Sequence, residues 1–266
     1  MEQLRLDDLY GWFEAYAGSY LETDSEAQAN IRLKIEHTRQ VCRVMGQLAD
    51  GEQLEPQQAR IAAAVALLHD VGRFPQYRRW RTFRDRDSDN HGRLAVEVIR
   101  EQQLLRGLPA EETLVIEEAV RFHNLLELPR KLRSPTDMYL RLVRDADKLD
   151  IWRVFVEQFR VPAAERASAA FLGFPDGMAV TPVCLQALAE RRVVRLETVK
   201  SVNDFRLLLI SWVFSLNYPA SRRILWHNGY VGQLAADVAD DAPERGAIDS
   251  ALAFLADQAG SKDIHP

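Results

Sequence analysis

Apolar residues recur along the chain at intervals of three or four positions, and almost no segment alternates apolar and polar residues. The first spacing places side chains on one face of an α-helix, whereas alternation is typical of a strand. The clearest apolar stripe lies within residues 25–49 and consists of Ile31, Ile35, Thr38, Cys42 and Met45. The pattern predicts an all-α protein.

Proline, glycine and Asx residues predict where the helices begin and end. Pro56 opens a helix that continues through the alanine-rich residues 61–68, and Gly72 and Pro75 end it. The next helix is capped by Asp89 or Asn90 and runs to about Leu105, where Gly107 closes it. Pro109 opens a helix that reaches His123, and Pro135 opens one that reaches at least Leu149. Further helices are expected at about 182–194, 200–217 and 244–258.

These elements predict one domain over residues 1–266. Its core covers about residues 25–160, preceded by an N-terminal helix and followed by a C-terminal helical extension, residues 161–266, packed on that core. The plausible boundary is an exposed turn marked by Gly173, Pro175 and Gly177.

Composition narrows the setting in which the protein works. With 47% hydrophobic and 27% charged residues, the chain can build a sizeable core. The longest apolar run, residues 207–216, is half of what a membrane span needs, about 20 residues. Only two cysteines are present, Cys42 and Cys184, so no disulfide framework is expected. The N-terminus lacks the layout of a signal peptide. We therefore expect a cytoplasmic protein with no membrane partner.

Four of the six histidines, His37, His69, His91 and His123, fall on successive predicted helices. Each lies on or beside the apolar face of its helix, so all four imidazoles are expected to point to the interior where the helices meet. Helical bundles build metal sites in this way. A lone histidine on an apolar face is more often a hydrogen-bonded core residue, and His227 and His265, which have no partner pattern, are interpreted as structural or exposed.

The dipeptide His69-Asp70 places an imidazole and a carboxylate together at one helix end. An imidazole suits iron, zinc and manganese, and a carboxylate adds the negative charge that holds a pair of divalent cations. A later aspartate would complete the set. Asp147 lies on the apolar stripe of its helix, whereas Asp145 is better explained by a surface ion pair with Arg141. Asp150 is interpreted as a surface carboxylate, with a supporting role behind the ligands as the alternative.

This arrangement resembles the HD-domain superfamily of metal-dependent phosphohydrolases, in its six-ligand version that holds two metal ions. The resemblance covers about residues 30–160 and rests on His37, the segment 67–73, the segment 88–92, His123-Asn124 and the segment 145–150. It implies that His37, His69, Asp70 and Asp147 bind one ion and that His91 and His123 complete the site of the second, with Asp70 bridging. The ions would be iron or manganese, with zinc, cobalt or magnesium as alternatives.

The resemblance also implies roles in the reaction. Arg73 occupies a position that is often Lys or Arg in the family, and Lys148 follows the final aspartate, so both are candidates to bind a substrate phosphate. The predicted catalytic residues are His69, Asp70 and Lys148.

The segment 73–93 carries seven arginines against three aspartates, a charge of +4 in a chain whose total is −5. It joins the His69-Asp70 helix to the His91 helix, so it must pass close to the predicted metals. Guanidinium groups match phosphate oxygens in pairs, which makes Arg73, Arg78 and Arg79 candidates to bind an anionic substrate. The alternative is a solvated loop whose arginines pair with its own aspartates. Nucleic acid is disfavoured, since the long basic stripe of a duplex binder is missing.

We therefore predict a phosphohydrolase that cleaves a phosphate ester, in a nucleotide or another small phosphorylated compound, with a metal-activated bridging water. Two alternatives remain: a mixed-valent diiron oxygenase using the same ligands, and a non-catalytic helical binding protein. The sequence leaves homo-oligomerisation open.

Overall fold

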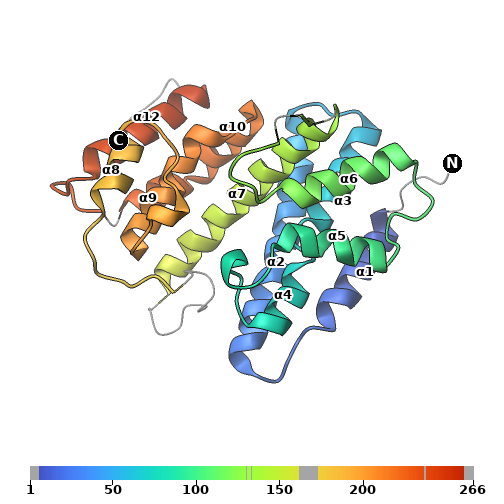
Figure 1. Cartoon of the computed structure of the whole chain (residues 1–266). Coiled ribbons are helices and arrows are strands. Elements are labelled where there is room, and N and C mark those ends of the chain that lie inside the picture. Colours follow the sequence, from blue (N-terminus) through green and yellow to red (C-terminus); the bar gives the residue numbers. More distant parts are fainter. Residues whose placement is uncertain (1–5, 130, 133, 162–172, 237, 261–266) are drawn as a thin grey trace. The chain divides into compact units, whose positions relative to one another are not determined.

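A computed structural model describes residues 6–129, 131–132, 134–161, 173–236 and 238–260. Throughout these ranges the regular structure is helical, so the predicted all-α class is confirmed (Figure 1). The first seven α-helices are α1 (Leu6–Gly18), α2 (Ser25–Gly51), α3 (Pro56–Leu68), α4 (Arg73–Trp80), α5 (His91–Glu101), α6 (Ala110–Phe122) and α7 (Thr136–Arg160). They are followed by α8 (Pro182–Ala189), α9 (Val202–Ser211), α10 (Pro219–Asn228), α11 (Tyr230–Ala236) and α12 (Arg245–Gln258). None of the described helices is long and apolar enough to cross a membrane.

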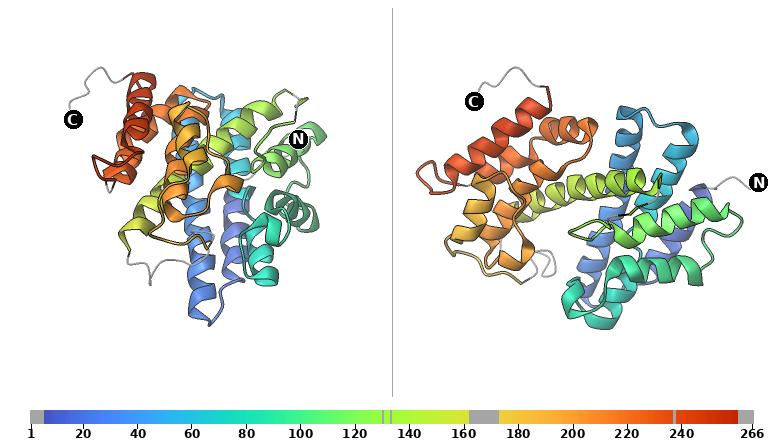
Figure 2. Two further views of the ribbon diagram at one scale, coloured as in Figure 1. Left: turned by 60° about the vertical axis from the view of Figure 1, so that its left-hand side comes forward. Right: turned by 45° about the horizontal axis from the view of Figure 1, so that its top comes forward.

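The chain forms two compact units, divided between Asp150 and Ile151. The division falls inside α7, which is one continuous helix (Figure 2). The first unit contains every predicted metal ligand. In the second unit, α12 contacts α8, α9, α10 and α11. The predicted packing of residues 161–266 on the core stays a prediction.

Helix α3 is the centre of the first unit and contacts α1, α2 and α6. Its alanine-rich sequence explains this position, because small side chains let neighbouring helices approach closely, and Ala62, Ala64 and Ala66 are fully buried. The predicted stripe of α2 is buried at Ile31, Ile35, Thr38 and Met45, with Cys42 half-buried. Outside its helix, Asp24 caps α2 by accepting a hydrogen bond from the backbone N–H of Ala27.

Two glycines set the distances between the helices that carry histidines. A Cβ atom on Gly72, between α3 and α4, would lie 2.3 Å from the backbone oxygen of His91. A Cβ atom on Gly92, at the start of α5, would lie 2.7 Å from the backbone oxygen of Arg121 on α6. Both positions therefore require the absence of a side chain. They bring the end of α3 against the start of α5, and α5 against α6.

The structure corrects several predicted boundaries. Pro75 does not end a helix but lies in the first turn of α4, where proline costs no hydrogen bond. The segment 73–93, expected to be a loop, thus contains α4 and the short 3₁₀ helix η1 (Asp85–Asp87). Helices α8 and α9 are shorter than predicted, and α10 and α11 were missed. Asn90, rather than Asp89, caps α5 by accepting from the N–H of Arg93.

Candidate metal centre

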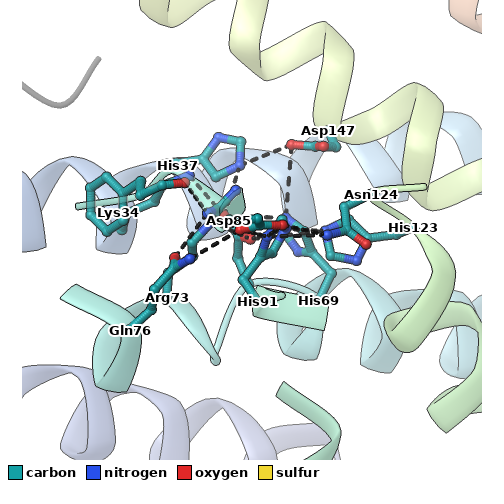
Figure 3. A network of polar contacts seen from close by, with 12 residues as sticks. Lys34, His37, His69, Arg73, Gln76, Asp85, His91, His123, Asn124 and Asp147 are labelled. Atoms are coloured by element: carbon teal, nitrogen blue, oxygen red, sulfur yellow. Dashed lines mark hydrogen bonds and ion pairs between the residues drawn. The ribbon is translucent and has the colours of Figure 1, made fainter. Parts of the chain in front are cut away.

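The six predicted ligands come together in the first unit, and Asp70 lies in the turn that follows α3. Figure 3 shows His37, His69, His91, His123 and Asp147 around the centre. His37 lies in the middle of α2 and Asp147 in the middle of α7. His69 and His123 follow the last residues of α3 and α6, and His91 opens α5. All four histidines and Asp70 are buried, whereas the side chain of Asp147 is 22% exposed.

The carboxylate of Asp70 lies between two groups of imidazoles. Its Oδ2 atom is 3.6 Å from Nε2 of His37 and 3.9 Å from Nε2 of His69. Its Oδ1 atom is 3.5 Å from Nε2 of His91 and 3.9 Å from Nε2 of His123. Asp147 completes the first group, with Oδ1 at 3.1 Å from His37 Nε2 and 3.9 Å from His69 Nε2.

Nδ1 of each of the four histidines has its own hydrogen-bond partner. Nδ1 of His69 donates to the backbone oxygen of Ala66, and Nδ1 of His123 donates to that of Val120, both at 2.7 Å. These carbonyls belong to the last turns of α3 and α6, where helices leave acceptors unpaired. Nδ1 of His37 lies 2.6 Å from Asp150. Because carbonyls and carboxylates only accept, the hydrogen is on Nδ1 and each Nε2 faces the centre.

Asp85 holds His91 in the same way: its two oxygens both lie 2.8 Å from Nδ1 of His91. Nε2 of His91 is 3.0 Å from Nε2 of His123. Burial lowers the pKa of His91, and burial together with its histidine neighbours lowers the pKa of His123 to about 3, so both rings are neutral at pH 7. Two lone pairs therefore face each other at hydrogen-bond distance with no hydrogen between them.

This arrangement fits a metal ion. Three trios of ligand atoms lie within 4.8 Å of one another, and they are His37–His69–Asp70, His69–His123–Asp147 and Asp70–His91–His123. Nε2 of His69 makes no hydrogen bond within the described residues, although it is fully buried. A cation would pair with these lone pairs and with the carboxylates, and the nitrogen and oxygen donors suit first-row transition metals. The buried cluster can therefore hold metal ions.

In the metal-free chain the two carboxylates are neutralised by other cations. Burial opposes ionisation of Asp70, but the positive charges of Lys34 and Arg73 hold its pKa well below the usual range. Burial and Lys34 both act to lower the pKa of His37, yet its hydrogen bonds to Asp147 and Asp150 prevail and raise it to about 9. His37 is therefore protonated at neutral pH when no metal is present.

Two aspartates of α7 are not where the sequence suggested. Asp150, interpreted as a surface carboxylate, is buried and anchors His37; the alternative of a supporting role behind the ligands is the one the geometry favours. Asp145 is fully buried, so its assignment to a surface ion pair was wrong, and Arg141 pairs with Asp137 instead. The residues Tyr139, Leu142, Ala146 and Leu149 are also buried, so α7 is enclosed on more than one face.

Two further residues of the site, Lys34 and Asp85, were not predicted from the sequence. Nζ of Lys34, one turn before His37 on α2, lies 2.9 Å from Oδ2 of Asp70, and the side chain is 17% exposed. The i to i+3 spacing to His37 was the signal that could have found it. Asp85 was counted only as a charge that offsets the arginines, and no periodic pattern links it to His91.

The predicted substrate-binding residues separate into two groups. Arg73 lies against the ligands, with Nε 3.4 Å from Oδ1 of Asp70. Lys148 follows Asp147 on α7, and burial lowers its pKa to about 8. Arg78 donates to the backbone oxygen of Ser19 and lies 3.8 Å from the ring centre of Tyr20. Arg79, also exposed, lies over the Trp80 ring.

His227 is exposed on α10, and His265 lies outside the described residues.

Comparison with known protein families found a match to the part of the chain that contains the predicted ligands. The sequence model of a family described as the HD domain matches residues 35–152. These residues form an HD domain. The match contains all six predicted ligands together with Asp85 and Asp150, and it confirms that the histidine and aspartate pattern is that of the HD-domain superfamily. Neither the curated proteins nor the solved structures contain a match to this chain.

The HD domain covers only part of the chain. Helix α1 and the first ten residues of α2, including Lys34, precede the matched segment. Helices α8 to α12 follow it. HD-domain proteins are generally metal-dependent hydrolases, and the cluster of buried histidines and aspartates in this HD domain is consistent with that class.

Proposed function

We propose that this protein is a phosphohydrolase that uses two divalent transition-metal ions to cleave a phosphate ester in a nucleotide or another small phosphorylated compound. One observation carries the proposal: the two oxygens of Asp70 face different imidazoles, Oδ2 toward His37 and His69 and Oδ1 toward His91 and His123. A carboxylate placed between two sets of imidazole rings is suited to bridge two cations.

Under this proposal Asp70 is shared, His37, His69 and Asp147 hold the first ion, and His91 and His123 hold the second. The nitrogen and oxygen donors admit iron and manganese, the ions that we propose, with zinc, cobalt and magnesium as alternatives. A pair of such ions supplies a hydroxide nucleophile at neutral pH and positive charge for the phosphoryl oxygens. No serine or cysteine nucleophile is then required.

Two cationic side chains beside Asp70 support the binding of an anionic substrate. Lys34 and Arg73 both contact Asp70, and both side chains are partly exposed, at 17% and 14%. A phosphate beside Asp70 would meet an ammonium group on one side and a guanidinium fork on the other. Lys148, which follows Asp147 on α7, is a further candidate to bind the substrate phosphate.

The test begins with elemental analysis of protein purified without chelators, which should give close to two ions per chain. Manganese- or iron-loaded protein should release phosphate from an aryl phosphate or from a nucleotide in a panel. His69→Ala and Asp70→Ala should abolish this release, whereas His227→Ala, an exposed position on α10, should retain it. Full activity in both site variants would refute the assignment.

The same preparation separates the alternatives. Oxygen consumption with an organic substrate, together with a coupled Fe(II)/Fe(III) spin signal, would identify the oxygenase reaction instead. Absence of bound metal, with no rise in thermal stability on adding Mn, Fe or Zn, would favour a binding protein, since a ligand of the folded state must stabilise it.

A further inference from the structure

Asp85 lies at the start of the 3₁₀ helix η1, between α4 and α5, and accepts hydrogen bonds from four side chains. Its Oδ1 atom accepts from Nη1 of Arg73 at 3.1 Å and from Nε2 of Gln76 at 3.0 Å. Its Oδ2 atom accepts from Nδ2 of Asn124 at 2.8 Å. Nδ1 of His91 lies 2.8 Å from both oxygens (Figure 3). One carboxylate thus joins α4, α5 and the end of α6.

The contact with His91 fixes which nitrogen of that ring carries the hydrogen. A hydrogen on Nδ1 leaves the lone pair on Nε2, which lies 3.5 Å from Asp70 and 3.0 Å from His123. A hydrogen on Nε2 instead would point at the place where the proposed second ion binds. The partner behind a ligand histidine commonly sets the tautomer in this way.

The contact with Arg73 fixes the guanidinium group. Nη1 of Arg73 also donates to Oε1 of Gln76 at 2.9 Å and to the backbone oxygen of Phe83 at 2.6 Å. Gln76 is fully buried and is itself held by Ser88 and Asp89. Nη1 is therefore fully engaged, while Nε, which is buried and makes no hydrogen bond in the described structure, lies toward Asp70.

We propose that Asp85 is a positioning residue for the second ion and for the substrate anion: it holds His91 in the tautomer that can bind metal and holds Arg73 beside Asp70. This inference rests on the proposed function. Asp85 would thereby link metal binding by His91 to anion binding by Arg73, two roles that the sequence assigned to separate residues. Removing the charge of Asp85 should weaken one ion site and anion binding together, and should leave the site of His37, His69 and Asp147 unchanged.

The variant Asp85→Asn tests this with almost no change of shape. All four partners of Asp85 are donors, so an amide NH₂ in place of one oxygen must face a donor, which favours the opposite tautomer of His91. Asp87→Asn is the matched control, because Asp87 lies on the same 3₁₀ turn but pairs, among the contacts described, only with the side chains of Arg84 and Arg86 and not with His91 or Arg73.

Manganese titration by calorimetry and spin resonance should show two ions in the wild type. In Asp85→Asn one ion should bind as in the wild type and the other about 10–100-fold more weakly, with KM for an aryl phosphate raised. Asp87→Asn should match the wild type. Unchanged binding of both ions in Asp85→Asn would overturn the inference. A wild type that binds no ion would instead contradict the proposed function.

A second measurement keeps the two failures distinct and needs no metal. Long-range ¹H–¹⁵N spectra of the metal-free protein report the tautomer of each histidine, and His91→Gln identifies the His91 signals. The ring should carry its hydrogen on Nδ1 in the wild type and in Asp87→Asn, and should lose that preference in Asp85→Asn. An Nδ1–H tautomer that persists in folded Asp85→Asn, or is absent from the wild type, would refute the role of Asp85.

Discussion

The candidate metal centre has an inner half, formed by His37, His69 and Asp147, and an outer half, formed by His91 and His123. The two halves are supported by different kinds of structure. In the inner half, His37 is anchored by Asp150, a side chain only 1% exposed, and both residues lie on the long helices α2 and α7. In the outer half, His91 is anchored by Asp85, which is 30% exposed and lies on a single 3₁₀ turn. The first anchor is enclosed by the core, whereas the second depends on side-chain hydrogen bonds from α4.

The halves also differ in charge when no metal is bound. The pKa of His37 is raised to about 9, so the inner half contains its own cation between Asp147 and Asp150. His91 and His123 have lowered pKa values and present uncharged lone pairs. An ion entering the inner half must therefore displace a proton, while one entering the outer half relieves an existing repulsion. The comparison indicates that pH should control the inner half more strongly.

The largest effect should come from removing the residue that both halves share. Asp70→Asn removes the negative charge between the four imidazoles, so the affinity for both ions should fall. Loss of a residue that only hydrogen-bonds to a metal ligand typically lowers metal affinity about 10–100-fold, and the loss at Asp70 should be larger. Calorimetric titration with Mn²⁺ measures this. Loss of only one ion would show that Asp70 belongs to a single half and would remove the basis for a bridging role.

The second effect is a pH dependence that belongs to the inner half. Because the pKa of His37 is raised from 6.5 to about 9 in the metal-free fold, its contribution to stability is fully present below pH 6.5 and is lost as pH rises to about 9. The shift corresponds to about 3 kcal/mol. The free energy of unfolding of the metal-free protein, measured in urea, should therefore fall over this range.

Asp150→Asn sharpens that test, because it removes one of the two carboxylates that raise the pKa of His37. The decline between pH 6.5 and 9 should become smaller in the variant, and Asp137→Asn, on the exposed surface of the same helix, should leave it unchanged. An equal decline in all three proteins would show that another group is responsible.

The third effect concerns the spacing of the outer half. Gly92→Ala would force α5 away from the backbone oxygens of Arg121 and Val120, and overpacking of this kind costs about 1–3 kcal/mol. Gly46→Ala is the control, since Gly46 lies within α2 with open space around it and should gain about 0.5–1 kcal/mol. Thermal unfolding of both variants checks the sign. Equal stabilisation by both would mean that α5 and α6 are not held this closely.

The smallest effect is expected at Arg78, the predicted anion contact whose guanidinium lies against Tyr20 and Ser19. Arg78→Ala should leave KM for an aryl phosphate unchanged and should lower stability by about 0.5–1 kcal/mol, the value of an exposed cation–π contact. Arg73→Ala should raise KM clearly. Equal increases in KM for both variants would place Arg78 in the substrate site.

The histidines were predictable because helical periodicity states directly which residues face the interior, and His37, His69, His91 and His123 all lie on buried faces. The same argument failed for Asp145 and Asp150. Helix α7 is buried on several faces, so its sequence has no single apolar stripe against which a carboxylate can be judged. Partners that approach from other helices decide the burial of these aspartates, and a pattern within one helix does not record them.

Some elements were missed although local signals existed. Pro75 was interpreted as the end of α3, but proline in a first turn is equally a helix start, and the short α4 follows Gly72 directly. Pro219 opens α10, and Gly229, with φ of +64°, closes it, which is the usual placement of these two residues. In contrast, the contact of Asp85 with His91 depends on how η1 folds back, which the local sequence does not specify.

Gly72 and Gly92 have a consequence for anyone who would build such a centre into another helical scaffold. Grafting the six ligand side chains at the right positions would not reproduce it, because the ring nitrogens converge only when three backbones come nearer than a β-carbon allows. A designer would have to copy the two glycines along with the six ligand side chains. The two aspartates that anchor the rings, Asp85 and Asp150, would have to be transferred with them.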